Sequence, residues 1–134
     1  MQKERAPLSE LGLKIGEVTQ LTGLSDSTLR HYDSVGLISP SKRSAGGFRL
    51  YDDRDVQRIL LIRRMKPLGF SLDQMRDFLD AADVVRGESS ASERAQAEAT
   101  IAGIREEAHA RYAKLQKQIG YAEDFLGTID ALEG

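Results

Sequence analysis

Apolar residues recur at helical spacing in two short segments near the start of the chain. The first runs from Ile15 to Leu21, and Gly23 follows at the position expected of a helix C-terminal cap. The second begins after Ser25, a suitable N-terminal cap, and ends at Gly36. Two brief helices joined by a tight turn predict a helix-turn-helix.

The pattern changes from helical to extended beyond these segments. The glycine pair at 46–47 permits the backbone angles of a hairpin tip. Phe48 and Leu50 then alternate with Arg49 and Tyr51, as in a half-buried strand. We therefore expect a small basic hairpin, or wing, next to the helix-turn-helix.

Two further helices are predicted after the wing. An aspartate at 52 or 53 caps the first, which ends around Pro67 and Gly69 because proline cannot continue a helix. Ser71 and Gln74 form a capping box for the second.

One long helical segment occupies the C-terminal part of the chain. Ser90 and Glu93 form its capping box, and no proline interrupts the residues that follow. From Tyr112 onward, apolar positions are separated by steps of 3, 4, 3, 4 and 3, which predict a coiled-coil seam. The predicted dimer-interface residues are Ile101, Ile104, Ala108, Tyr112, Leu115, Ile119, Ala122, Leu126 and Ile129.

Such a seam needs a partner. Gly103, Gly120 and Gly127 weaken the helix, since glycine costs about 1 kcal/mol relative to alanine in a helix interior. The same helix from a second copy of the chain is the simplest partner. A hairpin that folds back on its own domain at Gly103 or Gly120 is the alternative.

These elements predict a mainly α chain of four parts. We expect a disordered N-terminal tail over residues 1–12, a winged helix-turn-helix DNA-binding domain over 13–86, a linker over 87–93 and a coiled-coil dimerisation helix over 94–134. A length of 134 residues suits one small domain with an appendage.

Composition excludes several classes of function. The longest apolar run, residues 59–62, is far shorter than the roughly 20 residues that cross a bilayer. The first ten residues lack the apolar stretch of a secretory signal, so we expect a cytoplasmic protein without a membrane partner. There is no cysteine to form a thiolate metal site and no catalytic motif. We expect no enzyme activity, no cofactor and no metal.

Charge is distributed unevenly along the chain. Residues 28–66 contain nine basic and four acidic residues, a balance of +5, whereas residues 87–134 contain five basic and nine acidic residues, a balance of −4. Charge runs are often only solvated faces, but a local basic surface is what binding to nucleic acid requires.

The second helix, the wing and the end of the third helix supply candidate contacts to double-stranded DNA. An arginine on the second helix can read guanine or clamp a phosphate. The ring of Tyr32 belongs either to the core alone or to the core with its hydroxyl on a phosphate, and Lys66 either binds phosphate or is solvated. The candidate residues are Thr28, Arg30, His31, Tyr32, Arg43, Arg49, Tyr51 and Lys66.

The stretch from Ile15 to Leu79 resembles the MerR family of bacterial transcription regulators. The resemblance is carried by IGEVTQLTGLSDSTLRHYDSVGL, then GGFRLY, then DV at 55–56, then IRRMKPLGFSLDQM. It implies a winged-helix domain and an antiparallel coiled-coil homodimer on a pseudo-palindromic promoter site. It also implies that the dimer bends and untwists an overlong promoter spacer so that RNA polymerase engages both promoter elements.

The resemblance assigns roles to particular positions. Arg30 and Tyr32 match the arginine and aromatic residue of the family's recognition helix, and Arg43, Arg49 and Tyr51 match its wing contacts.

Two departures stand out. Ser27 occupies a position where many members have an arginine, so one DNA contact is missing or weaker. Pro67 occupies a position where a helical residue is usual, which leaves the end of the third helix and the pose of Lys66 open.

The signal is not assigned by the sequence. Metal-sensing and redox-sensing members use cysteines, which are absent here, and drug-binding members carry a large extra domain that a chain of this length does not hold. Tyr112, Tyr121 and Phe125 either line a small pocket or belong to the seam. Two alternatives to a regulator are a DNA-bending architectural factor and a coiled-coil module that binds another protein.

Overall fold

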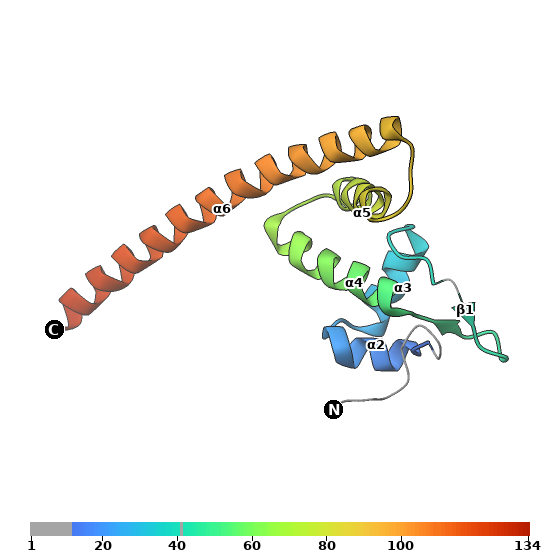
Figure 1. Ribbon diagram of the computed structural model, residues 1–134. Helices are drawn as coiled ribbons and strands as arrows, with labels where there is room; N and C mark the ends of the chain where they lie inside the picture. The colour runs from blue at the N-terminus through green and yellow to red at the C-terminus, as the bar shows by residue number, and fades with distance from the viewer. Residues whose placement is uncertain (1–11, 41) are drawn as a thin grey trace, which may run out of the picture. The chain divides into compact units, whose positions relative to one another are not determined.

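A computed structural model describes residues 12–40 and 42–134, so the predicted tail over residues 1–12 lies outside the described part except for Gly12. The chain is mainly α, with a winged helix-turn-helix followed by a long C-terminal helix, as predicted (Figure 1). Its elements are α2 (Ile15–Thr22), α3 (Asp26–Ser34), β1 (Lys42–Arg43), β2 (Arg49–Leu50), α4 (Asp53–Met65), the 3-10 turn η1 (Lys66–Leu68), α5 (Leu72–Arg86) and α6 (Ala91–Glu133).

The turn between α2 and α3 is built by local capping. Gly23 has a φ of 76°, a left-handed conformation that favours glycine, and its N–H donates to the Thr19 carbonyl at 2.8 Å. Ser25 then caps α3, because its hydroxyl accepts from the Thr28 N–H at 3.1 Å. Both predicted caps are confirmed.

The wing is a short antiparallel hairpin whose inner face differs from the predicted one. Arg43 pairs with Arg49 in the ladder, and Gly47, with a φ of 82°, lies in the turn. Tyr51 and Leu13 exchange two backbone hydrogen bonds of 2.8 Å, which place Tyr51 in the core with no exposed surface. Phe48, predicted on the half-buried face, is 69% exposed. That prediction is wrong because the pairing with Leu13 is not visible in the local alternation.

Asp52, rather than Asp53, caps α4. Its carboxylate accepts from the Asp55 N–H at 2.9 Å, and the Asp55 carboxylate accepts from the Asp52 N–H at 3.0 Å. At the other end, Pro67 and Gly69 act as predicted: α4 ends at Met65, Pro67 lies in η1, and Gly69 closes the turn with a φ of 88°.

The described residues divide into two compact units, and the boundary lies within α5 between Leu79 and Asp80. The first unit, which ends at Leu79 and is called the head below, has a core drawn from α2, α3, α4, α5 and the end of the wing. Its fully buried side chains are Val18, Thr22, Leu29, Tyr32, Leu37, Ile38, Tyr51, Ile59, Ile62, Met75 and Leu79.

Helix α6 is continuous over 43 residues. Ser90 caps it, with the Glu93 N–H donating to the Ser90 hydroxyl at 3.1 Å, so residues 91–93 of the predicted linker form its first turn. Because the helix passes through Gly103 and Gly120 without a break, the alternative of a hairpin at those glycines is wrong. Within the ranges described, no helix is both long and apolar enough to cross a membrane.

Candidate nucleic-acid interface

Helix α3 presents one face to the core and the other to solvent. Leu29 and Tyr32 are buried, at 0% and 1% exposure, while Arg30 and His31 are exposed. Thr28 is half-buried, and its hydroxyl accepts from the Ser25 hydroxyl at 2.9 Å. The side chains predicted to face a DNA groove therefore lie on the accessible side of the helix.

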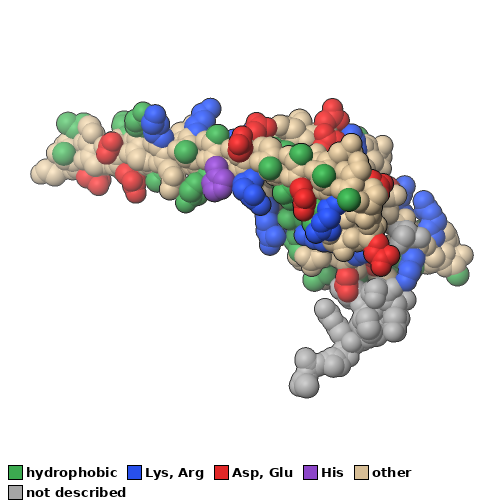
Figure 2. All heavy atoms as spheres, turned by 45° about the horizontal axis from the view of Figure 1, so that its top comes forward, with side chains coloured by type: hydrophobic (Ala, Val, Ile, Leu, Met, Phe, Trp, Pro, Cys, Tyr) green, Lys and Arg blue, Asp and Glu red, His purple; other side chains and the backbone are tan. Residues whose placement is uncertain are grey.

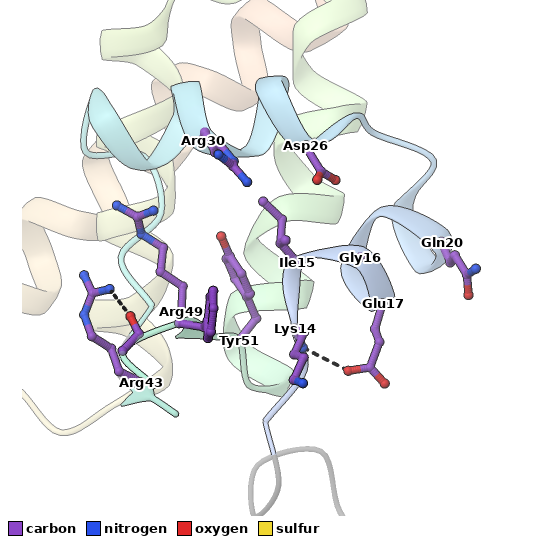
Figure 3. Close-up of a pocket in the computed structure, with 12 residues that line it drawn as sticks. Lys14, Ile15, Gly16, Glu17, Gln20, Asp26, Arg30, Arg43, Arg49 and Tyr51 are labelled. Atoms are coloured by element: carbon purple, nitrogen blue, oxygen red, sulfur yellow. Dashed lines mark hydrogen bonds between the residues drawn. The ribbon is translucent and has the colours of Figure 1, made fainter. Parts of the chain in front are cut away.

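A cleft of about 800 Å³ lies between this face of α3 and the wing (Figure 3). Arg30 lines it from α3, Arg43 and Arg49 line it from the wing, and residues of α2 complete the lining. The carboxylates in its lining come from Glu17 and Asp26, and Glu17 is occupied in accepting from the Lys14 backbone N–H at 2.9 Å. The guanidinium groups shared by α3 and the wing suit an anionic ligand.

Arg49 fastens the wing to α3. Its Nε donates to the carboxylate of Asp33, whose side chain is only 16% exposed, against 42% for that of Arg49. Arg43 is held within the hairpin, since its Nη1 donates to the Gly47 carbonyl at 3.1 Å. Both wing arginines are thus positioned before any ligand arrives, which lowers the entropy lost on binding.

Tyr51 lies beneath this layer of charge. Its hydroxyl is buried and has no hydrogen-bond partner among the described residues. Burial, and then the negative charge of Asp33, raise the pKa of the Tyr51 hydroxyl, so that it stays protonated. The predicted contact between Tyr51 and DNA is not tested by this arrangement and stays a prediction.

At the far end of α4, Lys66 is exposed and its Nζ lies 5.7 Å from the centroid of the Tyr32 ring. At this distance the ring attracts the ammonium group through a cation–π interaction. The Tyr32 ring is part of the core, as both interpretations required. Contacts from its hydroxyl and from Lys66 to phosphate stay predictions.

Three arginines that the sequence does not distinguish from surface cations hold the backbone of the helix-turn-helix. The side chain of Arg58 donates to the Leu37 carbonyl at 2.6 Å, that of Arg63 to the Thr22 carbonyl, and that of Arg76 to the Val35 carbonyl. Hydrogen bonds from charged donors satisfy carbonyls that would otherwise be orphaned at helix ends. The acceptors lie 21 to 41 residues away in sequence, so no local signal reveals these contacts.

A short helix that exposes Arg30 and is fastened to a basic hairpin defines a winged helix-turn-helix DNA-binding protein. Two family models match the chain: the MerR HTH family regulatory protein model over residues 13–82 and the MerR DNA-binding model over residues 56–120. The chain belongs to the MerR family of transcription regulators and binds double-stranded DNA, as its sequence motifs predict.

Among curated proteins, the chain is 32% identical over 120 residues to the HTH-type transcriptional regulator HmrR of Sinorhizobium medicae, covering 90% of this chain and 74% of that protein. It is 30% identical over 122 residues to heavy metal-dependent transcription regulator 2 of Rhizobium meliloti, covering 91% and 75%. These relatives are regulators rather than enzymes, which confirms that no enzyme activity is to be expected.

Solved structures share the fold. A putative MerR family regulator from Listeria monocytogenes superposes with a TM-score of 0.58 and 27% identity, over 88% of this chain and 80% of that one. HiNmlR, a MerR family regulator lacking the sensor domain and bound to promoter DNA, superposes with a TM-score of 0.64 and 24% identity, over 87% and 88%.

Proposed function

We propose that this chain regulates transcription as a homodimer, in which two copies join through α6 as an antiparallel coiled coil and place their two heads on a pseudo-palindromic promoter site. The observation that carries the proposal is an apolar seam that α6 leaves exposed. Spacing of such a seam at three and four residues is what a second helix packs against.

The seam is exposed over its C-terminal half. Leu115, Ile119 and Leu126 are 40%, 58% and 59% exposed, and Tyr112 is 58% exposed. Figure 2 shows hydrophobic side chains at the surface of α6. Apolar surface of this extent is costly in water, at about 25 cal/mol per Å² left uncovered. Of the other predicted interface residues, Ala122 is exposed, and four are half-buried: Ile101, Ile104, Ala108 and Ile129.

Tyr121 and Phe125 are exposed aromatic residues next to predicted seam positions in the sequence. Each precedes a seam residue, Ala122 or Leu126, by one position and so projects about 100° away from it. They are 64% and 65% exposed and would flank a coiled coil. Both interpretations of these residues, as the lining of an effector pocket or as part of the seam, stay predictions.

The proposed dimer acts by deforming DNA. Two clefts at a fixed separation hold two half-sites, and bending and untwisting the spacer between promoter elements brings both within reach of RNA polymerase in response to a signal. The elastic cost of such a deformation, of order 1–6 kcal/mol for a smooth bend, is offset by the contacts that the bent duplex gains.

Replacement of a seam residue tests the dimer. We expect Leu115→Asp to yield monomers in sedimentation equilibrium and to weaken binding to a duplex with two half-sites, since the coil buries that side chain. Ala113→Asp is the matched control, because this exposed alanine lies away from the seam on the same turn. A monomeric wild-type protein, or a Leu115→Asp variant that remains dimeric, overturns the proposal.

The symmetry of the site is tested on DNA. Selection of bound fragments from genomic DNA is expected to return two inverted half-sites upstream of genes. Enrichment of intrinsically bent DNA without a shared motif would instead identify an architectural factor.

A further inference from the structure

Phe48 is an aromatic residue that the wing leaves in solvent. It is 69% exposed, and it lines the cleft together with Arg30, Arg43 and Arg49. What sets Phe48 apart from other exposed apolar residues is its place in the lining of a cleft that also contains three arginines. The arginines suit the phosphates of a DNA ligand, but charge gives the phenyl ring no role.

The ring is held in place by the hairpin turn. Backbone hydrogen bonding fixes the residue, with the Ser44 N–H donating to the Phe48 carbonyl at 2.8 Å and the Phe48 N–H donating to the Ser44 hydroxyl at 3.2 Å. The ring then lies over Gly46, where a Cβ would come within 3.2 Å of the Phe48 Cε2 atom. Glycine at 46 thus provides the space that lets the ring rest on the turn.

A cleft with cations and one apolar wall suits a ligand that alternates charge with apolar surface. A DNA strand has this pattern, because each phosphate is followed by a deoxyribose whose C–H groups are apolar. We propose that Phe48 packs against a deoxyribose of the strand whose phosphates meet Arg30 and Arg43. The proposal rests on the cleft between α3 and the wing being part of the DNA interface.

The placement of the ring favours a sugar over a base step. A side chain that wedges between bases must enter the stack, and it kinks the duplex when it does so. The ring of Phe48 instead lies back on Gly46 and forms part of the cleft lining. Packing on a sugar adds contact area without neutralising a phosphate, so it contributes affinity that salt does not screen.

The test separates this contact from the charged ones by salt dependence. Dissociation constants of the full-length chain for a short random-sequence duplex are measured from low to moderate salt, because a sugar contact carries no sequence information. We expect Phe48→Ala to weaken binding roughly tenfold at every salt concentration with an unchanged slope of log K against log salt. Arg43→Ala is the matched comparison, and we expect it to reduce the magnitude of that slope by about 1.

Two further variants guard against a misfolded wing. Phe48→Leu retains apolar area and is expected to recover most of the affinity, whereas Gly46→Ala displaces the ring without changing charge and is expected to weaken binding. Unchanged affinity in Phe48→Ala, or a slope change equal to that of Arg43→Ala, overturns the proposal. A loss of duplex bending in Phe48→Ala also overturns it, since that result identifies a wedge. Each comparison of affinities is valid whether the protein is a monomer or a dimer. Failure of the dimer proposal would be detected independently, by sedimentation equilibrium.

Discussion

The arginines of the head make different kinds of contact. Arg30 is exposed on α3 and faces the cleft, whereas Arg49 donates to Asp33 and Arg63 donates to a backbone carbonyl. Not every guanidinium counted over residues 28–66 is therefore available to contact DNA directly. Arg63 acts on DNA binding by fixing the backbone at the end of α2.

Arg30 is the residue whose loss should affect DNA alone. We expect Arg30→Ala to weaken binding to the selected site by about 1–3 kcal/mol, because the guanidinium contacts a base edge or a phosphate and not the core. Fluorescence anisotropy measures the affinity, and sedimentation checks that the dimer persists. Equal affinity for wild type and variant would remove α3 from the interface.

Asp55 gives the head a pH-dependent stability. Burial raises the pKa of its carboxyl to about 6, and the charge of Asp52 adds to the shift against the hydrogen bond from the Asp52 backbone. A raised pKa means that the fold favours the protonated acid, so this contribution is complete below about pH 4 and is lost as pH rises through 6.

Replacement of Asp55 by asparagine tests the sign of this pH dependence of stability. We expect the free energy of unfolding of Asp55→Asn, relative to wild type, to improve by on the order of 2 kcal/mol between pH 4 and pH 7.5. Chemical denaturation at a series of pH values gives the difference. A difference that stays constant across this range contradicts the assignment.

At the scale of elements, α2 and α3 depend on their neighbours. They contain eight and nine residues, fewer than an isolated helix needs to persist in water. Arg58 and Arg63 of α4 and Arg76 of α5 bond to carbonyls at or just beyond the ends of these helices. The recognition surface is therefore stable only as part of the whole head.

The contribution of one such bond can be measured with adjacent residues. We expect Arg63→Ala to lower the free energy of unfolding by about 1–2 kcal/mol, because the Thr22 carbonyl loses a charged donor. Arg64→Ala replaces the next residue of the same helix, which is also exposed, and should change stability by less than about 0.5 kcal/mol. Equal thermal shifts for both variants would rule out a special role for Arg63.

Elements bounded by local chemistry could be predicted from the sequence. Ser25, Asp52 and Ser90 cap helices because a side-chain oxygen accepts from the N–H three residues ahead. Both groups lie within four consecutive residues, so the sequence alone indicates the cap. The sidedness of the wing could not be predicted, because it is set by pairing between Tyr51 and Leu13, which are far apart in sequence. Asp33 was missed as the partner of Arg49 for the same reason.

At the scale of the molecule, basic charge and apolar surface lie in different parts of the chain. The basic residues gather in the head, and α6 combines a net acidic composition with an apolar seam. Acidic helices repel DNA, so this division favours duplex contact through the heads alone.

A dimer with a fixed separation of heads makes a geometric prediction about the site. Inserting about five base pairs between the half-sites turns one of them to the opposite face of the duplex, and we expect affinity to fall at least tenfold. An insertion of about ten base pairs restores the facing but moves the half-sites about 34 Å further apart, so heads at a fixed separation should not recover the affinity. Gel-shift titration measures the affinity for the original duplex and for the two with insertions. An affinity unchanged by the insertion of five base pairs would mean that the heads bind independently.

The arginine-to-carbonyl bonds have a consequence for genetics. A screen for alleles that lose regulation of the promoter would return substitutions of Arg58, Arg63 and Arg76 as well as of Arg30. Unfolding of α2 or α3 weakens DNA binding, as does the removal of a DNA contact. Alleles of the first three arginines would be temperature-sensitive and rescued by growth in the cold, whereas the defect of an Arg30 substitution would persist at every temperature.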